Sequence, residues 1–185
     1  MSIIINDTEY EIDSDYYSLN SCNIITIPIE LFDFTDLVEL DLSYNNIFVL
    51  PKEISNLENL KLLDISFNKL LEIPKELCFL PYLRQLFLGH NLIEKIPKEI
   101  GMLSQLEELS VRYNKLTEIP KDICILTELE ILYLDENQII TLPKELLNLP
   151  CLIEFNIINN NLDEESIVIL DSLKNKIKNR LEDLI

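Results

Sequence analysis

The hydrophobic positions of this chain repeat every 23 residues. Two consecutive units read LVELDLSYNNIFVLPKEISNLEN and LKLLDISFNKLLEIPKELCFLPY. Three markers keep the same step: leucines at Leu37, Leu60, Leu83, Leu106, Leu129 and Leu152, asparagines at Asn45, Asn68, Asn91, Asn114, Asn137 and Asn160, and prolines at Pro28, Pro51, Pro74, Pro97, Pro120 and Pro143. Chance does not produce this register, so one structural unit is copied along the chain.

Each unit combines a strand pattern with a turn pattern. The alternation around Leu40 and Leu42 predicts a short strand with one buried face. Pro51 suits the start of a short helix or 3₁₀ turn because its φ angle is fixed near the helical value. Ile54, three residues on, turns one face of that segment inward. The Asn45 amide, which follows the strand, can donate to and accept from backbone groups that leave the sheet, so stacked copies predict an asparagine ladder.

A single unit cannot bury its own hydrophobic face, so the units must stack on one another. Seven apolar columns would then form a shared core, typified by Leu37, Leu40, Leu42, Ile47, Leu50, Ile54 and Leu57. Strands about 4.8 Å apart would make a parallel sheet roughly 30 Å long for seven units.

The unit L-x-x-L-x-L-x-x-N-x-L-x-x-L-P-x-x-I-x-x-L-x-x resembles the leucine-rich-repeat family over residues 14–162. Its tail, L-P-x-x-I-x-x-L, resembles the intracellular group with Ras-related plant repeat proteins and Ras-pathway scaffolds. The resemblance implies an α/β solenoid, or horseshoe, with a parallel sheet on the concave face and short helices or 3₁₀ turns on the convex face. In the degenerate first unit, residues 14–36, Ser14 takes the leucine slot and Cys22 the asparagine slot, where the family accepts cysteine.

The two ends of the chain predict caps for a single domain. Residues 1–13 form the expected N-terminal cap, with two short strands within residues 3–12. Residues 14–162 hold about six full repeats and a partial one. Residues 163–185 have helical periodicity, and the acidic residues at 163–165 suit a helix N-terminus. We expect a capping helix; the alternative is a partner-binding helix with these basic residues on its solvent side: Lys174, Lys176, Lys178 and Arg180.

Composition narrows the function classes. The formal net charge of −18 argues against a nucleic-acid binder, because phosphate contacts need a basic surface. No apolar run reaches the roughly 18 residues of a membrane helix, and the start of the chain lacks a secretory signal. We therefore expect no membrane association and a cytoplasmic protein. The absence of alanine, with abundant Ile, Asn and Lys, resembles proteins of AT-rich genomes, such as those of some amoebae and of their large DNA viruses, and would imply host cytoplasm if the source is viral.

Neither the cysteines nor the recurring Pro-Lys-Glu triplets indicate a catalytic or metal site. The four cysteines show no metal-ligand spacing, and Cys78 and Cys124, two units apart, are roughly 10 Å from each other on the strand spacing, beyond disulfide reach. We expect four thiols, no metal and no cofactor. The lysine and acidic rows that follow each proline are either a convex docking strip or, as we favour, a solvated surface.

The variable strand positions point away from the core and contain the candidate site. In the eighth slot of four successive units stand Tyr44, Phe67, His90 and Tyr113. Nearby slots add aromatic and charged residues of the kinds that dominate protein interfaces, and we call the whole set the concave patch: Tyr44, Phe67, Phe87, His90, Arg112, Tyr113, Tyr133 and Asp135. Gly89 removes a side chain beside Phe87, which predicts a notch. Two alternatives stay open: the aromatics only cover the asparagine ladder, and Arg112 only pairs with Asp135.

These features favour a non-catalytic, monomeric protein-interaction module. The acidic surroundings of the concave patch suit a partner with a basic patch, and a small GTPase is one candidate by analogy with Ras-pathway repeat proteins alone. An inhibitor that caps a basic enzyme is an alternative. An enzyme, such as a ubiquitin ligase with leucine-rich repeats, is disfavoured because no nucleophile, base and orienting group stand together. From the short regions outside the repeats we also expect no catalytic domain.

Overall fold

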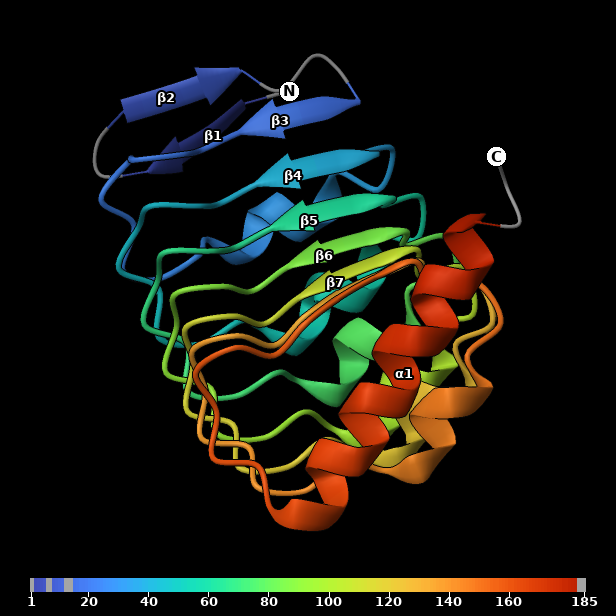
Figure 1. Ribbon diagram of the computed structural model, residues 1–185. Coiled ribbons are helices and arrows are strands. Elements are labelled where there is room, and N and C mark those ends of the chain that lie inside the picture. The colour runs from blue at the N-terminus through green and yellow to red at the C-terminus, as the bar shows by residue number, and fades with distance from the viewer. Residues whose placement is uncertain (1, 6–7, 12–14, 183–185) are drawn as a thin grey trace.

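Seven short parallel strands stack along one side of the molecule, opposite a row of helical turns (Figure 1). The computed structural model describes residues 2–5, 8–11 and 15–182. In that part of the chain the strands of the large sheet are β3 (Tyr16–Ser18), β4 (Glu39–Asp41), β5 (Leu62–Asp64), β6 (Gln85–Phe87), β7 (Glu108–Ser110), β8 (Ile131–Tyr133) and β9 (Glu154–Asn156). They lie in chain order, which confirms the predicted solenoid with one strand per repeat.

Neighbouring strands pair without any shift of register. Glu39 pairs with Leu62, and Leu62 in turn pairs with Gln85, so equivalent positions of successive units lie side by side. The middle residue of each strand points into the core: Leu40, Leu63, Leu86, Leu109 and Leu132 are all fully buried. The flanking residues of each strand point to the other face, which places the variable positions in rows across the sheet.

The opposite side consists of 3₁₀ turns, each directly after a proline. Pro51 has φ −61° and serves as the N-cap of its turn, as the fixed proline φ angle predicts. The turns are η1 (Ile29–Asp33), η2 (Lys52–Asn56), η3 (Lys75–Phe79), η4 (Lys98–Met102), η5 (Lys121–Ile125) and η6 (Lys144–Asn148). Ile54 and its equivalents are buried. All seven predicted core columns are confirmed in this unit, with exposures between 0% and 3%.

The asparagine side chains form the predicted ladder. The Nδ2 group of Asn91 donates to the carbonyl of Leu88 in its own unit (3.1 Å) and to that of Ile65 in the preceding unit (3.0 Å). Its Oδ1 accepts the backbone N–H of Leu70 at 2.9 Å. One amide therefore satisfies backbone groups of two successive units, where each strand ends and loses its ladder partners. Cys22 occupies this slot in the first unit and is half-buried, with its Sγ near the Asn20 carbonyl.

Both ends of the stack carry elements that the sequence predicts. Strands β1 (Ser2–Ile5) and β2 (Thr8–Glu11) pair antiparallel, and Ile3 joins the core; the turn at residues 6–7 and Ser14 lie outside the described residues. The helix α1 (Glu164–Glu182) crosses the other end (Figure 1). The Asp163 carboxylate accepts the backbone N–H of Ser166 at 2.8 Å, and Ile169 and Leu173 are buried.

Two basic side chains of α1 contact the last repeat. Arg180 is half-buried, and its guanidinium donates to the carbonyls of Leu149 and Leu152. Lys176 donates to the carbonyl of Leu147. Lys176 remains exposed, whereas Arg180, which the alternative of a partner-binding helix places on the solvent side, is half-buried. They satisfy carbonyl groups of the last repeat, which has no following repeat in the described chain, and this favours the capping role of α1 over partner binding.

The cysteines form no disulfides among the described residues. The cysteines Cys22, Cys78, Cys124 and Cys151 are all free thiols, and burial raises the pKa of Cys78 and of Cys124 to about 12. These two thiols therefore stay protonated at neutral pH and are poor nucleophiles.

Within the described ranges, no helix is both long and apolar enough to cross a membrane.

The ladder predicts the cost of losing one rung. We expect Asn91→Ala to lower the free energy of unfolding by ~1–3 kcal/mol, because buried backbone groups of two units lose their partners. Chemical denaturation measures this difference. Asn160→Ala is the matched control: it stands in the same slot, but Asn160 is half-buried at the last rung, so its loss should cost less. Equal effects, or no effect at Asn91, would count against the ladder.

Candidate functional site

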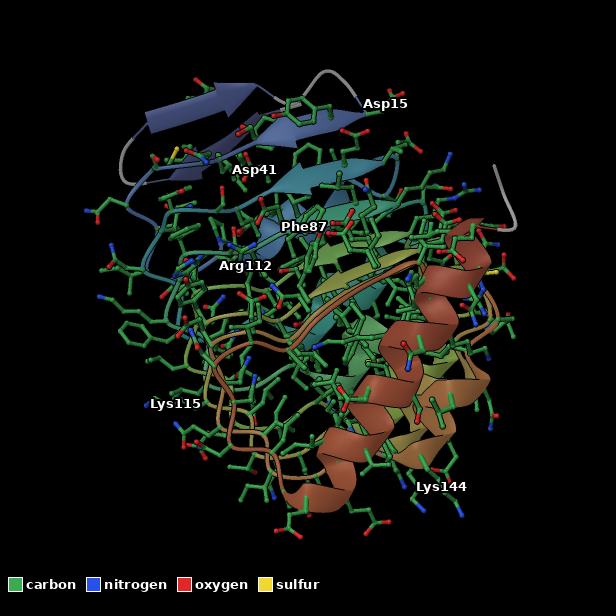
Figure 2. All side chains as sticks on the ribbon, viewed as in Figure 1. Asp15, Asp41, Phe87, Arg112, Lys115 and Lys144 are labelled. Atoms are coloured by element: carbon green, nitrogen blue, oxygen red, sulfur yellow. The ribbon has the colours of Figure 1, made fainter. Side chains whose placement is uncertain are left out.

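The outward side chains of the sheet form continuous rows because the strands pair in register. One row follows the third residue of each strand, and its members are Ser18, Asp41, Asp64, Phe87, Ser110, Tyr133 and Asn156. Figure 2 shows Asp41, Phe87 and Arg112 at the sheet and Lys144 among the helical turns. Two carboxylates and an aromatic ring thus lie on three adjacent strands, β4, β5 and β6.

Four rings of the eighth slot stack face to face. The ring centroids of Tyr44 and Phe67 are 4.2 Å apart, those of Phe67 and His90 4.0 Å, and those of His90 and Tyr113 4.1 Å. The interplanar angles lie between 8° and 13°. Tyr44 is 54% exposed, Phe67 37% and Tyr113 40%. The stack therefore presents a continuous aromatic edge to solvent along four repeats.

The stacked residues share a left-handed backbone conformation that recurs at the same slot of the other repeats. His90 has φ +55°, in the left-handed region, and the other three stacked residues have φ between 52° and 54°. Ser21, Glu136 and Asn159 occupy the same slot in other units and have φ between 57° and 58°. Because non-aromatic residues adopt the same angle, the bend after each strand demands it. A left-handed conformation costs roughly 1–2 kcal/mol for an L-residue, and ring stacking offsets part of that cost.

A hollow of about 300 Å³ opens at Gly89. Its lining residues come from three successive units: Asp64, Ser66, Phe67, Phe87, Gly89, His90, Ser110 and Arg112. This confirms the notch that the missing side chain predicts. A Cβ atom at Gly89 would lie 3.1 Å from Cγ of Arg112 and 3.4 Å from the Arg112 carbonyl oxygen. Glycine therefore lets the stem of Arg112 lie close to the backbone of the neighbouring unit and keeps the hollow open.

Arg112 makes two weak contacts on the far side of this hollow. Its Nε lies 3.9 Å from Oδ2 of Asp135, and its guanidinium carbon lies 5.7 Å from the centroid of the Tyr113 ring. Asp135 is only 7% exposed, and its Oδ1 has no hydrogen-bond partner among the described residues. Asp135 therefore lies too deep to be an open contact, unlike our expectation for this slot. Its Oδ2 faces the Arg112 guanidinium instead.

Burial shifts the pKa of two residues that line the hollow. Partial burial raises the pKa of Asp64 above its usual range; hydrogen bonds from Ser66 oppose this, and the nearby Asp41 charge adds to it. Burial, with the positive charge of Arg112, lowers the pKa of His90 below its usual 6.5, and Asp135 opposes this. His90 is therefore a neutral ring within the stack at pH 7.

Tyr133 lies outside the stack, and a hydrogen bond to Glu154 holds its side chain in place. Its hydroxyl donates to Oε1 of Glu154 on the next strand at 2.6 Å. This hydrogen bond, together with burial and the charges of Glu154 and Glu108, raises the pKa of Tyr133 to about 12. The phenol therefore stays protonated, and its ring is held across β8 and β9.

The structure brings together most of the concave patch. Phe67, Phe87, His90 and Arg112 share the hollow, and Tyr44 and Tyr113 extend the stack that forms one of its walls. Three further residues line the hollow that the concave patch did not include: Asp64, Ser66 and Ser110. The signal was present, since Asp64 and Ser110 stand one 23-residue step on either side of Phe87. Within the described residues, no three His, Cys, Asp or Glu side chains come together as a metal site requires.

Two family models match this chain. Residues 74–178 match a model described as "leucine-rich repeat region", and residues 35–93 match one described as "leucine rich repeat". A comparison with curated protein sequences gives no significant match.

Solved structures with the same fold come from bacteria and plants. A leucine-rich-repeat protein from Leptospira interrogans is 37% identical, with a TM-score of 0.78, over 80% of this chain and 38% of that one. An internalin from Listeria monocytogenes is 26% identical, with a TM-score of 0.73, over 82% of this chain and 43% of that one. The ectodomain of the Arabidopsis thaliana membrane receptor kinase GASSHO1/SCHENGEN3, solved in complex with CASPARIAN STRIP INTEGRITY FACTOR 2, is 34% identical over 74% of this chain and 17% of that one, with a TM-score of 0.69. This chain thus spans less than half the length of each.

The lowered pKa of His90 predicts a pH-dependent stability. Folding favours the neutral imidazole, so its contribution is complete above the unfolded pKa of about 6.5 and is lost as the pH falls below that value. His90→Phe keeps an aromatic ring in the stack and removes the titration; Phe67 shows that phenylalanine accepts this backbone angle. Between about pH 7.5 and about pH 5, the wild type should lose stability relative to His90→Phe in thermal melts. A constant difference would show that His90 is not coupled to its surroundings.

Proposed function

Because this chain belongs to the leucine-rich-repeat family, whose members generally act as protein-interaction modules, we propose that it is a non-catalytic module that binds a protein partner through the concave patch. The observation that carries the proposal is the exposed four-ring stack beside the Gly89 hollow. Aromatic rings held rigid before binding add contact area at little entropic cost.

Charge supports a partner with basic residues. The chain has a net charge of −18, and Glu39, Asp41, Asp64 and Glu108 lie on the same face as the stack. Complementary charge speeds association and disfavours acidic partners. A small GTPase remains one candidate by analogy alone. The same charge favours the second candidate function, in which the chain caps and inhibits a basic enzyme.

The proposal also covers the location, the oligomeric state and the source of the protein. We place the protein in the intracellular 23-residue group and in the cytoplasm, which the four free thiols support. We propose a monomer, with residues 1–13 and 163–185 as caps around repeats 14–162. Its composition suits a source with an AT-rich genome, amoebal or viral.

A pull-down tests which face binds. The wild type should recover a partner that Phe67→Ala/Phe87→Ala/Tyr133→Ala loses while it stays folded by circular dichroism. The matched control truncates three exposed apolar residues of the opposite face, Phe79, Met102 and Ile125, which are 45%, 58% and 65% exposed. We expect this control to retain the partner. If the control loses the partner and the concave triple variant keeps it, the binding surface is convex and the proposal is wrong.

A further inference from the structure

We infer that the Gly89 hollow receives one arginine side chain of the partner protein, an inference that rests on the proposed function. Its shape is the first argument. The hollow measures about 300 Å³, which suits one long side chain better than a folded element. It opens on the face that carries the aromatic stack, and its apolar walls are Phe67, Phe87 and the neutral ring of His90. The methylene stem of an arginine would pack against these rings.

The charges around the hollow favour a cation. Asp64 lines it, and Asp41 is the register partner of Asp64 on the next strand. The positive charge of Arg112 is balanced by Asp135, 3.9 Å away. With His90 neutral, the nearby groups therefore sum to a net negative charge that the chain itself leaves uncompensated.

The two carboxylates differ in how far they are already satisfied. Asp41 accepts three hydrogen bonds: its Oδ1 from the backbone N–H and the hydroxyl of Ser43, and its Oδ2 from the hydroxyl of Ser18. Asp64 accepts two hydrogen bonds, both from Ser66: the backbone N–H donates to Oδ1 at 2.8 Å, and the hydroxyl donates as well, whereas a carboxylate offers about four acceptor positions. Partial burial also removes water from Asp64, which raises its pKa. Asp64 is therefore the carboxylate that gains most from an incoming donor.

The walls favour a guanidinium over an ammonium group. A guanidinium is planar, stacks on aromatic rings and binds a carboxylate through two parallel hydrogen bonds. Phe87 stands beside Asp64 in the same row of the sheet, so one planar group could contact the ring and the carboxylate together. An ammonium group would use the carboxylate but not the face of the ring.

Peptide titration tests the inference. Three blocked peptides share the sequence Gly-Ser-X-Ser-Gly, with X as arginine, as citrulline (its neutral isostere) or as glutamate. Binding to the full chain is followed by the NMR shifts of backbone amides. We expect the arginine peptide to shift the amides of Phe87, Gly89 and His90, and to bind about tenfold or more tightly than the citrulline peptide, since it adds a charge-assisted hydrogen bond.

Two variants and one matched control locate the contact. Asp64→Asn keeps the side-chain volume and should weaken the arginine peptide about tenfold; Phe87→Leu should weaken it as well. Glu39→Gln removes the same charge from the same face, outside the hollow, and should change binding less than twofold. Equal binding of the arginine and citrulline peptides overturns the inference, as do equal effects of Asp64→Asn and Glu39→Gln. Preferred binding of the glutamate peptide overturns it in favour of an anion at Arg112.

The two proposals can fail separately. If the concave triple variant loses a partner in the pull-down while the arginine peptide shows no preference, only the arginine pocket is wrong. If the pull-down assigns binding to the convex face, the proposed function is wrong whatever the peptides do.

Discussion

Hydrogen bonds from a single asparagine per repeat hold successive units of this protein in register. Each Nδ2 reaches a carbonyl in its own unit and one in the unit before, and each Oδ1 accepts an N–H from the unit before, as Asn68 does from Ile47. These contacts satisfy backbone groups where the strands end, a role that apolar packing cannot fill. The parallel sheet, the buried columns and the rows of outward side chains all follow from this shared register.

The register also creates the candidate site. Since every strand pairs without a shift, side chains of one slot lie in one row, and four aromatic residues of the eighth slot become a stack with centroids 4.0–4.2 Å apart. A one-residue slip in any strand would break both the stack and the hollow at Gly89. The hydrogen bonds of the asparagines directly beneath the concave patch therefore make it rigid. A rigid aromatic surface loses little entropy on binding.

Most of the fold could be predicted from the sequence, because equivalent residues recur every 23 positions and each column has one role. Pro51 and Ile54 therefore marked a turn and its buried face correctly. The contacts of side chains that break the repeat could not be read in the same way. Arg180 turned back onto the carbonyls of Leu149 and Leu152, and Asp135 proved to be 7% exposed, because the environment of each depends on neighbours that occur once. Gly89 was informative because removing a side chain from a row leaves a predictable gap.

Hydrogen exchange of six backbone amides tests the asparagine ladder most directly. Ile24, Ile47, Leu70, Ile93, Leu116 and Ile139 each donate their backbone N–H to an asparagine Oδ1. None of the six lies in a strand or turn of the described chain, so without the ladder they would exchange as loop amides do. We expect protection comparable to that of the central strand residues Leu63 and Leu86. Exchange as fast as that of the exposed loop residues Glu72 and Lys95 would contradict the account.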